Sequence, residues 1–338
     1  MNRTALVPLG WDDALDRAVL DAGWIDAAAG RVARIDRGWA TVWLGDDQSV
    51  RLSTTGGAAA DGAVAVGDWV VVDDSGERAA AVLPRHSALT RRAPDGSAAA
   101  QVLGANVDVV ALCHALPAAP NPRRLERELV VGFDSGATPV VLLTKADRSD
   151  DPEAVRAAVA AIDPAVAVVT VSARSGEGLA ALLALTSDHR TLALLGSSGV
   201  GKSTLVNVLV GTDVQRTGAL RAGDGKGRHT TTAAELVRLP SGGLLLDTPG
   251  LRAVALWSDG SGLAQAFADV VAVAEGCWFA NCTHSHEPDC AVREAVAEGR
   301  LDAARVTSWQ HLSAELATLK EERAVRERVA RRGRPRDP

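Results

Sequence analysis

The sequence contains no tyrosine, and aromatic residues make up only 3% of its 338 residues. Large rings are therefore scarce, and alanine, valine and leucine must supply most of the hydrophobic core. Hydrophobic residues reach 47% and charged residues 23%, which is ordinary for a globular protein. The length is sufficient for two or three domains.

An excess of positive charge is also missing, since the formal net charge is −6. General binding of polyanions is thereby excluded, and any contact with nucleic acid must come from local basic patches. The N-terminus lacks an apolar core of signal-peptide length, and no charge-free run is long enough to span a bilayer. We expect a cytoplasmic monomer that does not associate with a membrane.

Cysteine is rare, but three of the four cysteines lie close together near the C-terminus. In a cytoplasmic protein this clustering favours metal binding over disulfides. Three thiolates and one imidazole complete a tetrahedral, structural Zn²⁺ site, and the alternative is three free thiols. Both His284 and His286 are available as the fourth ligand, beside Cys277, Cys282 and Cys290. The remaining cysteine, Cys113, lies within an apolar run and is interpreted as a core residue.

Three segments separate along the chain, at residues 1–95, 96–260 and 261–338. After a short acidic helix near 12–22, the first segment has five short alternating runs with turns between them. They predict an OB-fold-like barrel, or alternatively a small β-sandwich, with strands at 30–36, 39–44, 49–52, 68–72 and 79–83.

The second segment alternates apolar strands with helical stretches, which is typical of an α/β domain with a mainly parallel sheet. Strands are predicted at 107–112, 138–143, 166–171, 191–195 and 243–247. The third segment is predicted to be helical, to hold the cysteine cluster, and to end in an arginine-rich tail.

A phosphate-binding loop follows the strand at 191–195, because residues 196–203 read GSSGVGKS and a helical run comes next. Glycines let consecutive amides face the β-phosphate, and the helix N-terminus adds its dipole. Lys202 is suited to span the β- and γ-phosphates, and the Ser203 hydroxyl is suited to Mg²⁺. The alternative is a simple glycine-rich turn.

Acidic and mobile residues downstream of this loop complete a nucleotide site. Asp247 ends a buried strand and can hold Mg²⁺, while the amide of Gly250 can meet the γ-phosphate. The polar segment 223–232 lies between the two motifs and contains three consecutive threonines. We choose Thr231 as the residue that closes onto Mg²⁺, although the sequence leaves Thr230 and Thr232 open.

A guanine-reading motif precedes the phosphate loop. The strand at 138–143 ends at residues 144–147, TKAD, where a carboxylate can accept from N1–H and the 2-amino group of guanine. Lys145 can pack over the ring, and residues 172–174, SAR, can offer an amide to O6. A solvated loop is the alternative for TKAD alone. We expect nucleotide contacts from Thr144, Lys145, Ala146, Asp147, Ser172, Ala173, Gly196, Ser197, Ser198, Gly199, Val200, Gly201, Lys202, Ser203, Thr204, Asp247 and Gly250.

These motifs, in this rotated order, resemble those of circularly permuted GTPases. With the N-terminal barrel and the C-terminal cysteine cluster, the chain resembles the bacterial family of ribosome small subunit-dependent GTPases along nearly its whole length. The resemblance implies a GTP hydrolase that acts in late maturation of the small (30S) subunit, with that subunit stimulating turnover. It also implies zinc ligands at Cys277, Cys282, His284 and Cys290. Position 144 is Thr where Asn is commoner, which we expect to weaken the tie to the phosphate loop.

Directly after Gly250, many GTPases place a glutamine that orients the attacking water, and this chain has Leu251 there. Leucine cannot do this, so we expect slow intrinsic hydrolysis and a partner that completes the site. His229 in the polar segment is the candidate catalytic residue, and the resemblance points to it as well. The alternative is a loop histidine that contacts solvent or a partner.

Basic residues at 85–86, at 91–92 and in the tail at 323–336 stand out against the acidic average. They indicate contact with 16S rRNA phosphates, or else a solvated helix end and tail. The tryptophans of the barrel are open to two interpretations, as an RNA platform or as core. Two further functions remain: a GTP-gated RNA-binding module in which hydrolysis is incidental, and a P-loop kinase or ATPase, which Asp147 disfavours.

Overall fold

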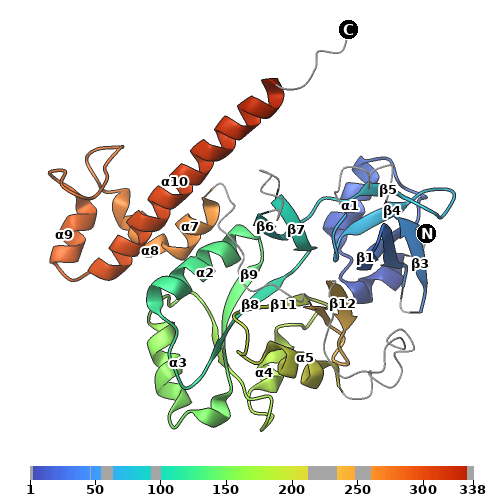
Figure 1. Cartoon of the computed structure of the whole chain (residues 1–338), viewed down its shortest axis with the longest axis horizontal. Coiled ribbons are helices and arrows are strands. Elements are labelled where there is room, and N and C mark those ends of the chain that lie inside the picture. Colours follow the sequence, from blue (N-terminus) through green and yellow to red (C-terminus); the bar gives the residue numbers. More distant parts are fainter. Residues whose placement is uncertain are drawn as a thin grey trace. The chain divides into compact units, whose positions relative to one another are not determined.

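The computed structural model describes residues 3–45, 47–54, 64–92, 100–211, 234–247 and 260–332 (Figure 1). Five strands near the N-terminus form a closed barrel. β1 pairs with β2 and β4, β2 pairs with β3, and β4 pairs with β5. A parallel bridge from Ser53 to Arg78 joins β3 to β5 and completes the circuit. The strands are β1 (Ala29–Asp36), β2 (Trp39–Trp43), β3 (Ser49–Ser53), β4 (Trp69–Val72) and β5 (Ala79–Val82).

Alternation along these strands separates the inside of the barrel from the outside. Val32, Val42, Leu52 and Val70 are buried together in the interior, as expected for strands with a period of two. The N-terminal segment covers part of the outside with η1 (Arg3–Leu9) and α1 (Asp13–Asp21). The closed five-stranded circuit confirms the OB-like barrel over the β-sandwich.

Hydrogen bonds between neighbouring strands join the barrel to the α/β sheet. The order runs β10-β9-β8-β11-β13-β12 and continues through β12 into β1 of the barrel, where Arg34 pairs with Glu235. All neighbours from β10 to β13 are parallel, and β12 is antiparallel. The strands are β8 (Val109–Ala115), β9 (Thr138–Thr144), β10 (Val168–Thr170), β11 (Thr191–Leu195), β12 (Glu235–Arg238) and β13 (Leu244–Asp247).

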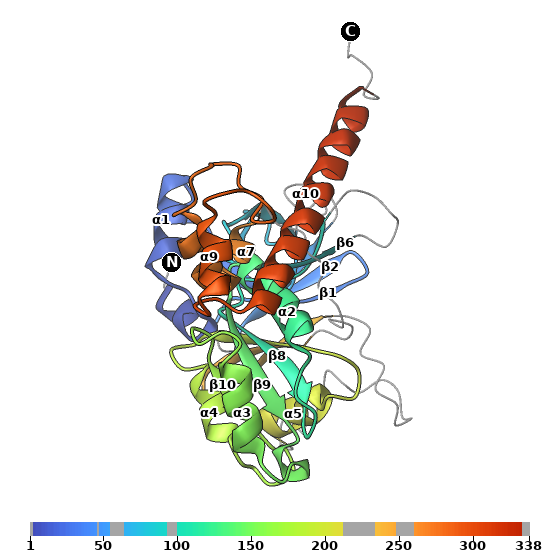
Figure 2. The same cartoon turned by 90° about the vertical axis from the view of Figure 1, so that its left-hand side faces the viewer.

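Helices flank this sheet. α3 (Pro152–Ala160) begins with Asp151 as N-cap and proline at its first position, a favoured combination. α4 (Leu179–Ala184) and α5 (Lys202–Val210) place Leu182, Leu205 and Leu209 in one core with alternate residues of β8, β9 and β11. α3 lies beside β10 (Figure 2). The parallel sheet and its helices confirm the predicted α/β class.

The C-terminal part is helical, as predicted, with α7 (Ser261–Ala266), α8 (Ala268–Ala274), α9 (Ala291–Ala297) and α10 (Ala303–Arg332). α2 (Pro122–Asp134) lies between β8 and β9 in the chain but packs on α7 and α10. Asp134 accepts a hydrogen bond from the amide of Gly262 at 2.6 Å. Arg305 bonds Asp269 at 2.7 Å and contacts Glu126 at 3.4 Å, which links α8, α2 and α10.

Two compact units result from these contacts. One comprises Met1–Thr90, Val102–Ala119 and Gly136–Val254, and the other Arg91–Gln101, Pro120–Ser135 and Ala255–Pro338. The barrel and the sheet thus form a single unit. β6 (Ala88–Arg92) and β7 (Ala100–Ala105) pair in a separate two-stranded sheet, and their residues are divided between the two units. The three domains at 1–95, 96–260 and 261–338 stay a prediction. Within the described ranges, every helix is too short or too polar to cross a bilayer.

Candidate nucleotide site and metal centre

The order of the strands places the nucleotide motifs together. From β8 the chain proceeds to β9 and β10 on one side, whereas β11 lies on the other side of β8 and leads to β13. Ligands of open α/β sheets bind outside the carboxyl ends of the strands at such a reversal. The phosphate loop follows β11 and the TKAD loop follows β9, so residues far apart in sequence meet at this edge.

The phosphate loop has the backbone that its glycines predict. Gly199 and Gly201 have φ of +81° and +102°, a region in which a side chain is strained. α5 begins at Lys202, so its first-turn amides lie at the loop. The Lys202 ammonium donates to the carbonyls of Gly196 and Ser197 at 2.6 and 2.9 Å. Lysine and loop are therefore already in contact, and Ser203 and Thr204 are exposed beside them.

The TKAD loop is fastened to the phosphate loop by two hydrogen bonds. The buried Thr144 hydroxyl lies 2.5 Å from the Val200 carbonyl and 3.2 Å from that of His114. The hydroxyl has a single proton, and it donates this proton to the closer of the two carbonyls, that of Val200. Lys145, at φ +58°, donates to the carbonyl of Gly199 at 2.5 Å. Threonine therefore supplies the tie for which asparagine is commoner, through a hydroxyl instead of an amide.

The Asp147 carboxylate, which is predicted to read the base, is oriented by the loop at residues 172–174. Ser172 is fully buried, and its hydroxyl donates to Asp147 Oδ1 at 2.6 Å. The same oxygen of Ser172 accepts from the amides of Arg174 and Ser175. This hydrogen bond from Ser172 holds the pKa of Asp147 below its ordinary value, so the carboxylate is charged at neutral pH. Asp147 is itself exposed and open to a ligand.

The other predicted nucleotide residues divide into those that the structure places and those outside the described ranges. Ala146 is buried, and its amide donates to the Val171 carbonyl at 3.1 Å, while Ala173 is half-buried beside Ser172. Asp247 ends β13 as predicted. His229, Thr231, Gly250 and Leu251 lie outside the described residues. The assignment of the nucleotide contacts stays a prediction.

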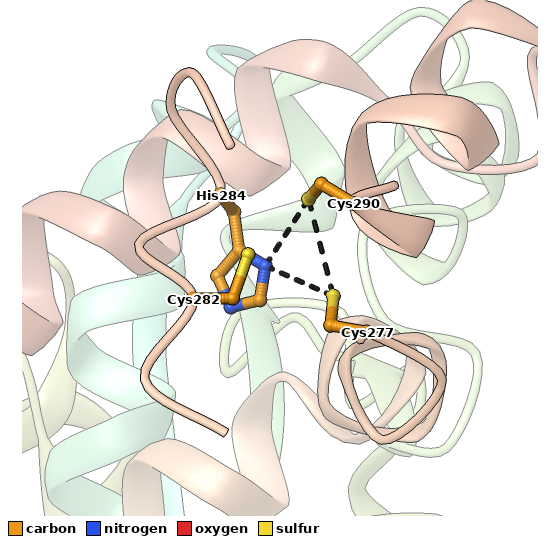
Figure 3. Close-up of side chains that lie close together, drawn as sticks. All are labelled: Cys277, Cys282, His284 and Cys290. Carbon is orange, nitrogen blue, oxygen red and sulfur yellow. Dashed lines mark hydrogen bonds between the residues drawn. The ribbon is translucent and has the colours of Figure 1, made fainter. Parts of the chain in front are cut away.

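The four predicted zinc ligands converge in the C-terminal part (Figure 3). The ligand atoms of Cys277, Cys282, His284 and Cys290 all lie within 4.8 Å of one another. The Sγ atoms of Cys277 and Cys290 are 3.9 Å apart, and each is 3.5 Å from His284 Nδ1. Tetrahedral Zn²⁺ with ordinary bond lengths requires S–S separations of about 3.8 Å and S–N separations of about 3.5 Å. The donor set fits zinc, and so do the spacings among Cys277, His284 and Cys290.

The loop around the cluster is held by neighbours that the sequence reasoning missed. Glu287 accepts from the amide and hydroxyl of Thr283 and from the amide of Ser285, and these bonds hold its pKa well below the ordinary value. Gln310 of α10 donates to the carbonyl of His284 at 3.2 Å. Partial burial lowers the pKa of His284, which favours the neutral imidazole that a metal needs. The sequence pointed to Glu287 only by placing an acidic residue inside the loop that carries the cysteines and histidines.

The predicted basic patch at residues 85–86 forms contacts within the protein itself. Arg85 makes two hydrogen bonds, at 2.6 and 2.7 Å, to the fully buried carboxylate of Asp68. The adjacent His86 lies 3.4 Å from Asp108. Of the barrel tryptophans, Trp69 is buried in the core, whereas Trp39 is 46% exposed. Arg85 is thus a structural residue, and Trp39 is available for a contact.

Comparison with known proteins gives consistent relatives. A family model described as RsgA GTPase matches residues 82–257. A protein of Streptomyces coelicolor named small ribosomal subunit biogenesis GTPase RsgA is 41% identical over 321 residues, covering 93% of this chain and 87% of the relative. A protein of the same name from Opitutus terrae is 43% identical over 330 residues, covering 92% and 90%.

Solved structures share the fold. YjeQ from Thermotoga maritima superposes with a TM-score of 0.64 at 24% identity, covering 86% of this chain and 98% of that one. YloQ, described as a circularly permuted GTPase, gives a TM-score of 0.62 at 23% identity, with coverage of 92% and 97%. At these identities the likeness supports the fold, and it agrees with the rotated motif order of this chain.

Proposed function

Because this chain belongs to the RsgA GTPase family, we propose that it binds and hydrolyses GTP during late maturation of the small (30S) ribosomal subunit, which stimulates its turnover. The relatives are named for small ribosomal subunit biogenesis. One observation carries the nucleotide assignment. The Asp147 carboxylate, oriented by Ser172, sits on a loop that Thr144 and Lys145 fasten to the phosphate loop.

The roles of the residues follow from their chemistry. Asp147 selects guanine, because adenine lacks the paired donors that a carboxylate accepts. Lys202 moves from its loop carbonyls to the β- and γ-phosphates when GTP binds. Ser203, Asp247 and Thr231 would hold Mg²⁺, which would neutralise phosphate charge. The positions of Ser203 in the first turn of α5 and of Asp247 at the end of β13 support this assignment.

Hydrolysis depends on a group that the partner brings into place. Leu251 cannot orient water, so we assign this role to His229, which acts when the partner is bound. Replacing His229 with alanine is expected to abolish most of the subunit-stimulated turnover while GTP affinity stays near that of the wild type. Unchanged stimulated turnover would remove His229 from the mechanism.

Zinc has a structural role in this proposal. Four protein ligands leave no open coordination position for a substrate, so the ion stabilises the loop between α8 and α9. The barrel and the C-terminal helices contact 16S rRNA or ribosomal protein on the subunit. We place the protein in the cytoplasm, because that is where bacterial small subunits mature. We also propose that it is a monomer.

The central test is GTP turnover with purified small subunits. Steady-state hydrolysis is measured for the protein alone and with small subunits, large subunits or naked 16S rRNA. We expect strong stimulation by small subunits and none by large subunits. Lys202→Ala serves as the inactive control for contaminating GTPases. Equal turnover under all conditions would contradict the proposal and favour a GTP-gated binding module.

A further inference from the structure

Arg31 is a buried cation at the junction of barrel and sheet. It lies on β1, is only 2% exposed, and stacks 5.4 Å from the ring of Trp69. Its guanidinium donates to the carbonyls of Leu9, Gly67 and Asn106 and to the hydroxyl of Thr191; the last two bonds, both from Nη2, measure 2.7 and 2.8 Å. One side chain thus joins the N-terminal segment, the barrel and two strands of the sheet.

Burying the charge of Arg31 costs free energy of solvation, so its contacts must offset this cost. Burial lowers the pKa of Arg31 to about 10, against the favourable charges of Asp108 and Asp68. The side chain remains protonated at neutral pH. Its hydrogen-bonding groups are satisfied by carbonyls and a hydroxyl from separate elements, an arrangement that depends on all of them staying in register.

The two sheet contacts of Arg31 lie at the starts of the strands that end at the nucleotide site. Thr191 is the first residue of β11, and Gly196 of the phosphate loop follows its last residue. Asn106 precedes β8, and the carbonyl of His114 near the end of β8 lies within reach of Thr144. At about 3.3 Å per residue, roughly 16 Å of strand separates Thr191 from the phosphate loop.

Thr191 is also clamped by the neighbouring strand. Its amide donates to Asp108 Oδ2 at 2.7 Å, and its carbonyl accepts from the amide of Asp108 at 2.9 Å. Both backbone groups of Thr191 and its hydroxyl are therefore committed. The Arg31–Thr191 bond therefore connects β1 of the barrel directly to the start of β11 in the sheet.

We propose that Arg31 is a positioning residue that couples the barrel to the phosphate loop through Thr191. Occupancy of the barrel by the small subunit then changes nucleotide affinity, and nucleotide changes subunit affinity by the same factor. This inference rests on the proposed function, since the small subunit is the barrel's ligand.

The test is a coupling measurement on the full-length protein. The affinity of a fluorescent, non-hydrolysable GTP analogue is determined with and without small subunits, and their ratio is the coupling factor. Thr191→Val removes the acceptor of Arg31 with little change in shape, and Thr191→Ser retains it. We expect the coupling factor to fall by about fivefold or more in Thr191→Val and to be preserved in Thr191→Ser.

If the Arg31–Thr191 bond only stabilised the fold, the variants would give different results. Thr191→Val would then lower the melting temperature and leave the coupling factor equal to that of the wild type, which would overturn the inference alone. Arg31→Lys, which keeps the charge but lacks the guanidinium fork, is the second variant and should lower the factor in the same direction. A wild-type coupling factor of one would overturn this inference, whereas the proposed function would fail only if small subunits left GTP turnover unchanged.

Discussion

The hydroxyl of Ser172 donates to Asp147 Oδ1 at 2.6 Å and joins two loops that lie 25 residues apart. Ser172 is fully buried, whereas Asp147 is exposed. The buried partner therefore fixes one carboxylate oxygen and keeps the pKa of Asp147 low, while the other oxygen remains available. A base-reading carboxylate must be both charged and oriented, and this contact provides both.

Replacing Asp147 with asparagine should shift base preference from guanine to xanthine. An amide cannot accept from both donors of guanine, whereas it can donate to the 2-oxo group of xanthine. We expect GTP affinity to fall by about a hundredfold or more and xanthosine triphosphate affinity to rise. Competition binding with both nucleotides measures the shift. Asp150→Asn, an exposed neighbour, is the matched control, and an unshifted preference for Asp147→Asn would refute the base assignment.

Replacing Ser172 with alanine should make nucleotide binding more sensitive to acid. The Ser172 bond lowers the pKa of Asp147, so its removal lets that pKa rise toward the ordinary value of about 3.9. Wild-type affinity is retained until the pH falls through the lowered pKa, and the variant loses affinity at a higher pH. GDP binding and carbon-13 NMR of the carboxyl, both followed from pH 6 down to about pH 3 so that the range spans the ordinary value, check this. Ser175→Ala is the control; an Asp147 pKa equal to that of the wild type would contradict the expectation.

The two histidines of the cysteine loop should differ in metal binding. His284 Nδ1 lies 3.5 Å from two thiols, whereas His286 is exposed and outside the cluster. We expect His284→Ala to lower zinc affinity by at least about a hundredfold, more than the loss of an outer partner costs. His286→Ala should retain one zinc per chain, as measured by mass spectrometry of the native protein. Equal loss in both variants would point to a different ligand set.

Removing Arg85 should destabilise the first unit. Asp68 is fully buried and bonded twice to Arg85, so Arg85→Ala leaves this carboxylate with only the Ala65 amide and the charge of Arg31 to stabilise it. Breaking such a pair from one side costs about 3 kcal/mol in the free energy of unfolding. Chemical denaturation measures the loss. Arg156→Ala, which breaks an exposed pair with Glu153, should cause no measurable change. Normal stability together with weakened subunit binding would restore Arg85 to an RNA-binding role.

Much of the candidate site was readable from consecutive residues. The phosphate loop requires glycines, a lysine and a serine at fixed spacing, because one turn of backbone must surround a phosphate. The cysteine cluster lies within 14 residues, so its convergence needs only a compact loop. The barrel strands followed from alternation, which is a property of each strand alone. These features are local, and the structure reproduces them.

The sequence by itself therefore determined which chemical groups the protein carries: a phosphate loop, a carboxylate predicted to read guanine, and a cluster of soft ligands suited to a metal. Only the tertiary structure decided which residues hold them. The strand order brings Thr144 to Val200 and Ser172 to Asp147, and it assigns Arg85 to Asp68. The Arg31–Thr191 bond spans 160 residues. Local motifs arise from backbone requirements over a few residues, whereas such partners depend on how distant strands align, and no short pattern records that alignment.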